Sequence, residues 1–210
     1  MIRVLIADDH PIVRQGLKQI LAEEPDIGEF GEAKNSQEVM DLIRKNEWDI
    51  VILDITMPGR GGMDILKEIR NERPKLPVLI LSIHPEDQYA VRALKAGAAG
   101  YMTKESAPDD LIKAIRKVLK GGKYISPSLA ESLAFFLERN DRKEPHETLS
   151  DREYQVMCMI AAGKKVKDIA ESLSLSVKTI STYRARILEK MRMKSNADLI
   201  HYAIQNKLIT

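Results

Sequence analysis

The chain has 210 residues, of which 44% are hydrophobic and 30% charged, an ordinary globular composition with room for one large domain or two small ones. It contains no apolar run of the roughly 18–20 residues that span a bilayer, so a transmembrane helix is not expected. The opening residues turn acidic at once, which predicts a strand and not a secretory signal. The single cysteine, Cys158, cannot form an internal disulfide, and this predicts a packed core thiol in a cytoplasmic protein.

The net charge of +2 is distributed unevenly along the chain. Residues 1–125 hold 19 Lys and Arg against 20 Asp and Glu, a net charge of −1, whereas residues 146–210 hold 11 against 7, a net charge of +4. Within residues 176–194, six basic side chains accompany one acid, Glu189. This concentration of positive charge indicates a surface that binds a polyanion, although a solvated helix face would explain the charge alone.

The first 125 residues alternate short apolar runs with amphipathic helical stretches. The apolar runs are Ile2–Ala7, Ile27–Ala33, Ile50–Leu53, Val78–Leu81 and Ala99–Met102. The helical patterns lie at about 12–24, 36–46, 62–73, 86–96 and 107–121. Ser36 is placed to cap the second helix, and Pro108 suits the first turn of the fifth. Apolar strands separated by helices predict an α/β doubly wound domain of flavodoxin-like type, with a five-stranded parallel sheet covered on both faces.

Residues 126–147 have the composition of a linker. A short helix fits Pro127–Arg139, and the charged stretch that follows is poor in apolar residues and interrupted by Pro145. We therefore expect one domain at 1–125, this linker, and a second domain at 148–210.

The second domain reads as an all-α fold of four helices. They are expected at about 151–162, 166–173, 177–191 and 196–206. Ser150 and Glu153 have the spacing of a capping box at the start of the first helix, and Gly163 suits the cap at its end.

Chemically active side chains stand where the strands of the predicted sheet end. They are Asp8 and Asp9, Asp54, Ser82 and Lys104. Because the carboxyl ends of parallel strands meet at one rim of the sheet, these groups should converge. Clustered carboxylates repel one another and call for a cation, and a site of a few carboxylates plus water is typical of Mg²⁺. The chemistry that this arrangement favours is phosphoryl transfer to a carboxylate, with the metal and the lysine neutralising the phosphoryl oxygens.

The segments that carry these residues resemble the receiver domain of bacterial response regulators. They are I-A-D-D-H at 6–10, V-I-L-D-I-T-M-P-G-R-G-G at 51–62, L-I-L-S at 79–82 and G-A-A-G-Y-M-T-K at 97–104. The resemblance implies that Asp54 accepts the phosphoryl group. It also implies that Mg²⁺ is held by Asp8, Asp9, Asp54 and the backbone carbonyl of Thr56. Ser82 and Lys104 would contact the phosphoryl group, and Tyr101 would be a switch residue that swings inward when Ser82 engages it.

Other readings of the same fold and residues are weaker. A flavin site would need a hydroxyl- and glycine-rich phosphate loop after the first strand, where this chain has Asp8-Asp9-His10. Phosphatases of the dehalogenase type carry a second aspartate two residues after the nucleophile, where this chain has Thr56. His10 and His84 lie near the rim, but the sequence assigns neither of them a proton to transfer.

Residues 166–191 have the spacing of a helix-turn-helix, with the turn Ser174-Leu175-Ser176 and Ser176 as the cap of the second helix. An apolar stripe predicts the buried face of that helix: Val177, Ile180, Ile187, Leu188 and Met191. Small and basic residues share the opposite side: Lys178, Ser181, Thr182, Ala185 and Arg186. This mixture suits a helix that enters the major groove of DNA and holds its phosphates.

This region, about 148–210, resembles the LuxR-type helix-turn-helix of the NarL/FixJ class. The matching segments are L-S-D-R-E at 149–153, D-I-A-E-S-L-S-L-S at 168–176 and K-T-I-S-T-Y-R-A-R-I at 178–187. The resemblance implies double-stranded DNA contacts from Lys178, Thr179, Ser181, Thr182, Arg184, Ala185 and Arg186. Two positions depart from the class: Arg184 stands where a small apolar residue is common, and Lys165 stands at a cap position where Ser or Thr is usual.

Both halves together predict a phosphorylation-controlled transcriptional regulator of a two-component system, and not an enzyme in its own right. A sensor histidine kinase or a small phosphodonor would phosphorylate Asp54, and the shifted receiver would favour a homodimer that reads two promoter half-sites. No membrane partner is expected. The alternative is a receiver that regulates a protein partner through its basic helix, and charge reversal at Lys178 and Arg186 would separate the two hypotheses.

Overall fold

The structure is a computed structural model that describes residues 1–210 except 58–59, 107, 139–143, 207 and 210. The first residue of the predicted fifth helix, the last of the predicted linker helix and two residues of the 51–62 motif therefore lie outside the described residues. The chain forms two compact units, Met1–Leu133 and Ala134–Thr210. Within the described ranges, no helix combines the length and the apolar character needed to cross a membrane.

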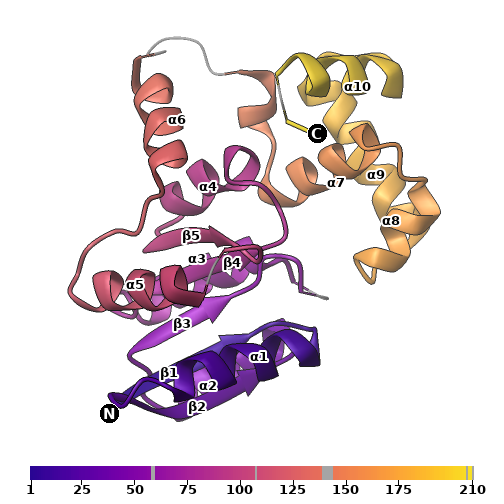
Figure 1. Cartoon of the computed structure of the whole chain (residues 1–210). Helices are drawn as coiled ribbons and strands as arrows, with labels where there is room; N and C mark the ends of the chain where they lie inside the picture. The colour runs from indigo at the N-terminus through magenta and orange to yellow at the C-terminus, as the bar shows by residue number, and fades with distance from the viewer. Residues whose placement is uncertain (58–59, 107, 139–143, 207, 210) are drawn as a thin grey trace. The chain divides into compact units, whose positions relative to one another are not determined.

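The first unit is built on a five-stranded parallel sheet in the order β2-β1-β3-β4-β5, flanked by five helices (Figure 1). The strands are β1 (Ile2–Ala7), β2 (Ile27–Ala33), β3 (Ile50–Leu53), β4 (Val78–Ser82) and β5 (Gly100–Thr103). The helices are α1 (Pro11–Ala22), α2 (Ser36–Lys45), α3 (Gly62–Glu72), α4 (Glu86–Lys95) and α5 (Pro108–Leu119). Every residue of β3 and β4 is buried, as continuous apolar strands covered on both faces should be. The predicted doubly wound fold is confirmed.

One helix start differs from the prediction. Asn35, not Ser36, caps α2, because the Asn35 side chain accepts a hydrogen bond from the Glu38 amide at 3.0 Å. Ser36 is already helical and buried, and its hydroxyl donates to the Arg60 carbonyl at 2.6 Å. Both residue types cap helices well, and the tertiary partner of Ser36 decides between them. Pro108 begins α5 as expected.

The segment after α5 stays attached to the first unit. Tyr124 forms an isolated parallel bridge with Gly100, and its amide donates to the Ala99 carbonyl at 2.9 Å. Ser126 then caps α6 (Pro127–Glu138): its hydroxyl accepts from the Leu129 amide at 3.1 Å and donates to the Glu86 carboxylate. The expected linker zone therefore begins with ordered structure.

The second unit carries a short 3-10 helix, η1, and four α-helices. They are η1 (Pro145–Thr148), α7 (Asp151–Ala161), α8 (Val166–Ser172), α9 (Val177–Lys190) and α10 (Asn196–Gln205). Helix α7 contacts α8, α9 and α10, so it forms the centre of the unit. The four predicted helices are confirmed.

The helix ends of this unit follow the sequence signals closely. The capping box of Ser150 and Glu153 is formed at α7, and Ser176 caps α9. Gly163 has φ of +80° and ends α7 with its amide 2.9 Å from the Ile160 carbonyl, a left-handed conformation that favours glycine. Lys165 does stand at the cap of α8, without a side-chain hydrogen bond to it.

An ion pair between a buried carboxylate and a half-exposed lysine ties α7 to α9. Glu153, only 3% exposed, accepts a hydrogen bond from Lys190 Nζ at 2.6 Å and another from the Ser150 amide at 2.8 Å. Burial by itself raises the pKa of Glu153, but Lys190 and Ser150 outweigh it and hold that pKa below its ordinary value.

Candidate functional site

The strand ends of the first unit bring the predicted acids and the lysine together. Asp8 follows β1, Asp54 follows β3 and Lys104 follows β5. Lys104 Nζ lies 2.7 Å from Asp54 Oδ2 and 2.6 Å from Asp8 Oδ2, and both aspartates are only 1% exposed. The convergence expected from the sequence is present in the structure.

The charge on Lys104 is stabilised by this pairing. Burial disfavours its ammonium, but Asp54 and Asp8 outweigh the burial and raise the pKa of Lys104 above its ordinary value. The rim therefore keeps a fixed positive charge at neutral pH, next to the carboxylate proposed to react.

The acidic cluster fits a divalent cation. Ligand atoms of Asp8, Asp9, His10 and Asp54 all lie within 4.8 Å of one another. Asp8 Oδ2 and Asp9 Oδ1 are buried and, among the described residues, receive no hydrogen bond of good geometry, although Lys104 Nζ and His10 Nδ1 stand at ion-pair distance. Buried carboxylate oxygens with unused lone pairs are the ligands that Mg²⁺ takes.

Thr56 holds Asp54 in a way that the sequence did not reveal. Its amide and its hydroxyl both donate to Asp54 Oδ1, at 2.9 and 2.6 Å. The other carboxylate oxygen is the one that faces Lys104. Asp54 thus has a fixed orientation, whereas the expectation for Thr56 concerned its backbone carbonyl alone.

Gly62 lets α3 approach this rim closely. An added Cβ at Gly62 would lie 2.4 Å from Ile55 Cα and 2.6 Å from the Asp54 carbonyl oxygen. Since both atoms belong to the backbone next to the acceptor candidate, only glycine fits there without moving it.

Ser82 and Tyr101 meet at the segment after β4. Both are fully buried; Ser82 Oγ accepts from the His84 amide at 3.1 Å, and the Tyr101 hydroxyl donates to the His84 carbonyl at 2.9 Å. The imidazole of His84 lies against the ring of Tyr89, with ring centroids 4.8 Å apart. Tyr101 is therefore turned inward and tied to the segment that begins at Ser82, and it is not a surface aromatic.

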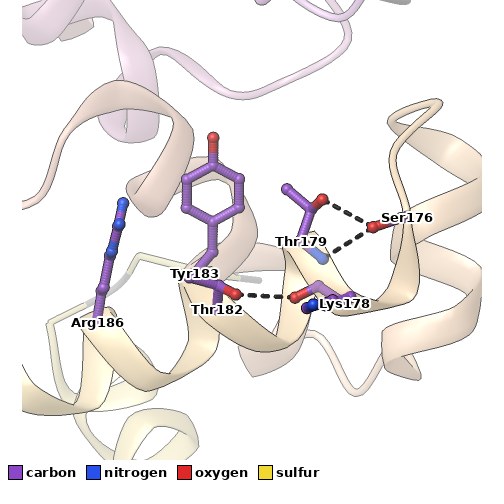
Figure 2. A pocket seen from close by; sticks show the side chains of 6 residues that line it. All are labelled: Ser176, Lys178, Thr179, Thr182, Tyr183 and Arg186. Atoms are coloured by element: carbon purple, nitrogen blue, oxygen red, sulfur yellow. Dashed lines mark hydrogen bonds between the residues drawn. The ribbon is translucent and has the colours of Figure 1, made fainter.

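The second unit presents a hollowed face along α9. The hollow is lined by Ser176, Lys178, Thr179, Thr182, Tyr183 and Arg186, whose side chains Figure 2 shows. Lys178, Ser181, Thr182, Ala185 and Arg186 are all exposed. This is the polar side expected for groove contact, and Tyr183 also lines the hollow.

Arg184 has a partner that the sequence did not predict, and Val177 differs from its expected burial. Arg184 Nε donates to the Asn196 side chain at 2.6 Å, so its guanidinium ties α9 to α10. Val177 was expected in the buried stripe but is 50% exposed, because it is the first residue of the helix and precedes the packed turns. Ile180, Ile187 and Met191 are buried as expected.

Comparison with known proteins agrees with both halves of this description. Residues 4–116 match the family model of the response regulator receiver domain, and residues 147–203 match that of the bacterial regulatory proteins of the luxR family. The chain therefore belongs to the response regulators of the NarL/FixJ class, which are phosphorylation-controlled, DNA-binding transcription regulators.

Individual relatives match along almost the whole chain. The chain is 37% identical to the response regulator UvrY of Escherichia coli over 99% of its own length and 96% of the relative's. It is 37% identical to the response regulator GacA of Pseudomonas aeruginosa over 100% and 98%. Among solved structures it is similar to RcsB of Salmonella enterica serovar Typhimurium bound to promoter P1flhDC in the presence of the phosphomimetic BeF₃⁻, with 29% identity, a TM-score of 0.62 and coverage of 96% and 97%.

Proposed function

We propose that Asp54 is the residue that accepts the phosphoryl group. The observation that carries this is its setting: a carboxylate 1% exposed, with one oxygen held by Thr56 and the other by Lys104. An oxygen of Asp54 attacks the phosphorus of a phosphohistidine on a sensor kinase, or of a small phosphodonor, and the bond to the donor breaks. Lys104 Nζ, which contacts Asp54 Oδ2, would then pair with the phosphoryl oxygens.

Mg²⁺ would be held by the carboxylates of Asp8, Asp9 and Asp54 and the backbone carbonyl of Thr56. When bound, it supplies neutralising charge to the phosphoryl oxygens. The buried oxygens of Asp8 and Asp9, which accept no well-formed hydrogen bond among the described residues, support this assignment.

Ser82 and Tyr101 transmit the change. The Ser82 hydroxyl would donate to the phosphoryl group. A movement of Ser82 would shift His84, whose amide is bonded to the Ser82 hydroxyl, and His84 would in turn shift Tyr101, whose hydroxyl is bonded to the His84 carbonyl. This continuous hydrogen-bonded path supports a two-state receiver whose balance is set by phosphorylation.

The output is binding of promoter DNA by α9, with contacts from Lys178, Thr179, Ser181, Thr182, Ala185 and Arg186; Arg184 contributes through the packing of α9 on α10. Activation favours a homodimer that reads two half-sites. The domains proposed are the receiver 1–125, the linker 126–147 and the DNA-binding domain 148–210. A regulator that binds the chromosome acts in the cytoplasm, and the single buried thiol suits that compartment.

The acceptor is tested by phosphorylating the full chain with acetyl phosphate and Mg²⁺. Asp54→Asn keeps the shape of the side chain but removes the nucleophile, so incorporation of phosphate, measured by the intact mass, should fall to zero. Asp64→Asn, the same change at an exposed aspartate in the first turn of α3, should leave incorporation unchanged. Stoichiometric phosphate on the Asp54→Asn variant would show that another residue is the acceptor.

A further inference from the structure

The imidazole of His10 lies at the exposed edge of the acidic cluster, with one nitrogen turned toward the carboxylates. Its Nδ1 is 2.8 Å from Asp9 Oδ1 and 3.2 Å from Asp8 Oδ1. Ligands of an octahedral ion with bonds of 2.0–2.1 Å stand about 3 Å apart along each edge. His10 Nδ1 thus lies at the spacing of a neighbouring ligand from each of these two oxygens.

The backbone holds His10 in this position. Its amide donates to Asp8 Oδ1 at 2.8 Å, and its carbonyl accepts from the Arg14 amide at 3.2 Å at the start of α1. Pro11 follows directly and restricts the conformation of the residue before it. His10 stands at the N-cap of α1 but its side chain does not cap the helix, so the imidazole is available to the cluster.

The second observation that points to an ion comes from Asp9. Its Oδ1 is a buried atom that receives no well-formed hydrogen bond within the described part of the chain, and it lies 2.8 Å from His10 Nδ1. A buried carboxylate oxygen with an unused lone pair, beside an imidazole nitrogen, is a mixed oxygen and nitrogen donor set.

We propose that His10 is a nitrogen ligand of the divalent cation at this site, and that it makes the site favour imidazole-binding transition metals such as Mn²⁺ over Mg²⁺. The inference rests on the metal site of the proposed function and adds a residue to it. Imidazole binds first-row transition ions well, whereas Mg²⁺ prefers oxygen and retains water. The coordinating form carries its proton on Nε2, on a side chain 62% exposed to solvent.

The test is pulsed electron paramagnetic resonance of the full chain loaded with Mn²⁺ alone. A coordinated imidazole gives a nitrogen-14 modulation, which should be present in the wild type and absent from His10→Asn. Because loss of even an outer partner of a metal ligand costs about tenfold in affinity, the Mn²⁺ affinity of His10→Asn should fall by at least about that factor. The Mg²⁺ affinity, measured by displacement of Mn²⁺, should change much less. His84→Asn removes the other histidine near the rim and should keep the nitrogen signal.

Each alternative result has a distinct meaning. Mn²⁺ that binds the wild type without nitrogen modulation would overturn the role of His10 and leave the carboxylate site intact. A wild type that binds no Mn²⁺ would overturn both the role of His10 and the metal site of the proposed function. Equal loss of Mn²⁺ and Mg²⁺ affinity in His10→Asn would show that His10 acts on the carboxylates and not on the choice of metal.

Discussion

At the residue scale, the position of Asp54 depends on Gly62, a residue without a side chain. Gly62 starts α3 with its amide 3.2 Å from the Ile55 carbonyl, and a side chain there would enter the backbone of Asp54 and Ile55. Packed interiors do not yield easily to an added carbon, so the strain would reach the neighbouring carboxylate.

We predict that Gly62→Ala lowers the free energy of unfolding by about 1–3 kcal/mol, the usual cost of overpacking, and slows phosphorylation of Asp54. Urea denaturation and the rate of phosphate incorporation measure the two effects. Gly16→Ala is the matched control: Gly16 lies within α1 with nothing within 4 Å of an added Cβ, so this change should stabilise the protein by about 0.5–1 kcal/mol. Equal effects of the two changes would contradict the packing argument.

Residue roles were predictable where they follow from strand order. A parallel sheet must bring Asp8, Asp54 and Lys104 to one rim, and it does. The cap at Asn35 was not predictable, because Asn35 and Ser36 both suit a cap and the tertiary partner of Ser36 decides between them. The tie between Arg184 and Asn196 was not predictable either, because it joins side chains of two different helices.

At the element scale, the buried carboxylate of Glu153 has two roles: it completes the capping box at the start of α7, and it binds Lys190 of α9. We predict that Glu153→Gln lowers the free energy of unfolding by about 1–2 kcal/mol at pH 7, since a charged partner of a half-exposed lysine is lost. The folded pKa of Glu153 lies below its ordinary value of 4.5, so its contribution is full above that pH and is lost as the pH falls through the folded pKa. The difference between wild type and variant should therefore shrink below pH 4.5.

Denaturation with urea between pH 3 and pH 7 measures this dependence. The control is Glu189→Gln, an exposed position on α9 that changes the net charge equally and should stay within about 0.5 kcal/mol of the wild type. If the difference in free energy of unfolding between the wild type and Glu153→Gln stays constant from pH 3 to pH 7, the charge of Glu153 contributes nothing to stability.

We predict that different residues of helix α9 contact the DNA phosphates and read the bases. Thr182 Oγ1 donates to the Lys178 carbonyl at 3.0 Å (Figure 2), which leaves its methyl group and its acceptor lone pairs for a base edge. Lys178 carries an exposed point charge suited to a phosphate. Lys178→Ala should weaken binding to all duplexes alike and reduce the salt slope by about one unit.

Thr182→Ala should instead alter the preference at one base pair by about 1 kcal/mol or more, with the salt slope unchanged. Salt titrations of the preferred and a scrambled duplex distinguish the two variants. If both change only the salt slope, α9 is a non-specific electrostatic surface.

At the scale of the whole molecule, the sequence predicts two folded parts but not how one controls the other. The order of apolar runs is enough to predict the sheet, and the capping residues correctly predict the starts of α7 and α9. The attachment of the segment 124–129 to the first unit was not predictable, because it depends on tertiary contacts such as the bridge of Tyr124 with Gly100 and the hydrogen bond between Ser126 and Glu86. Local patterns contain no signal for such isolated tertiary contacts.

We propose that phosphorylation of Asp54 governs which DNA the protein binds. The most direct measurement is capture of genomic DNA fragments by the purified full chain, sequenced with and without BeF₃⁻ and Mg²⁺, for the wild type and for Asp54→Asn. We predict that BeF₃⁻ enriches a defined set of fragments with the wild type and leaves the fragments retained by Asp54→Asn unchanged. The same enrichment with both proteins, or no change with either, would contradict the account.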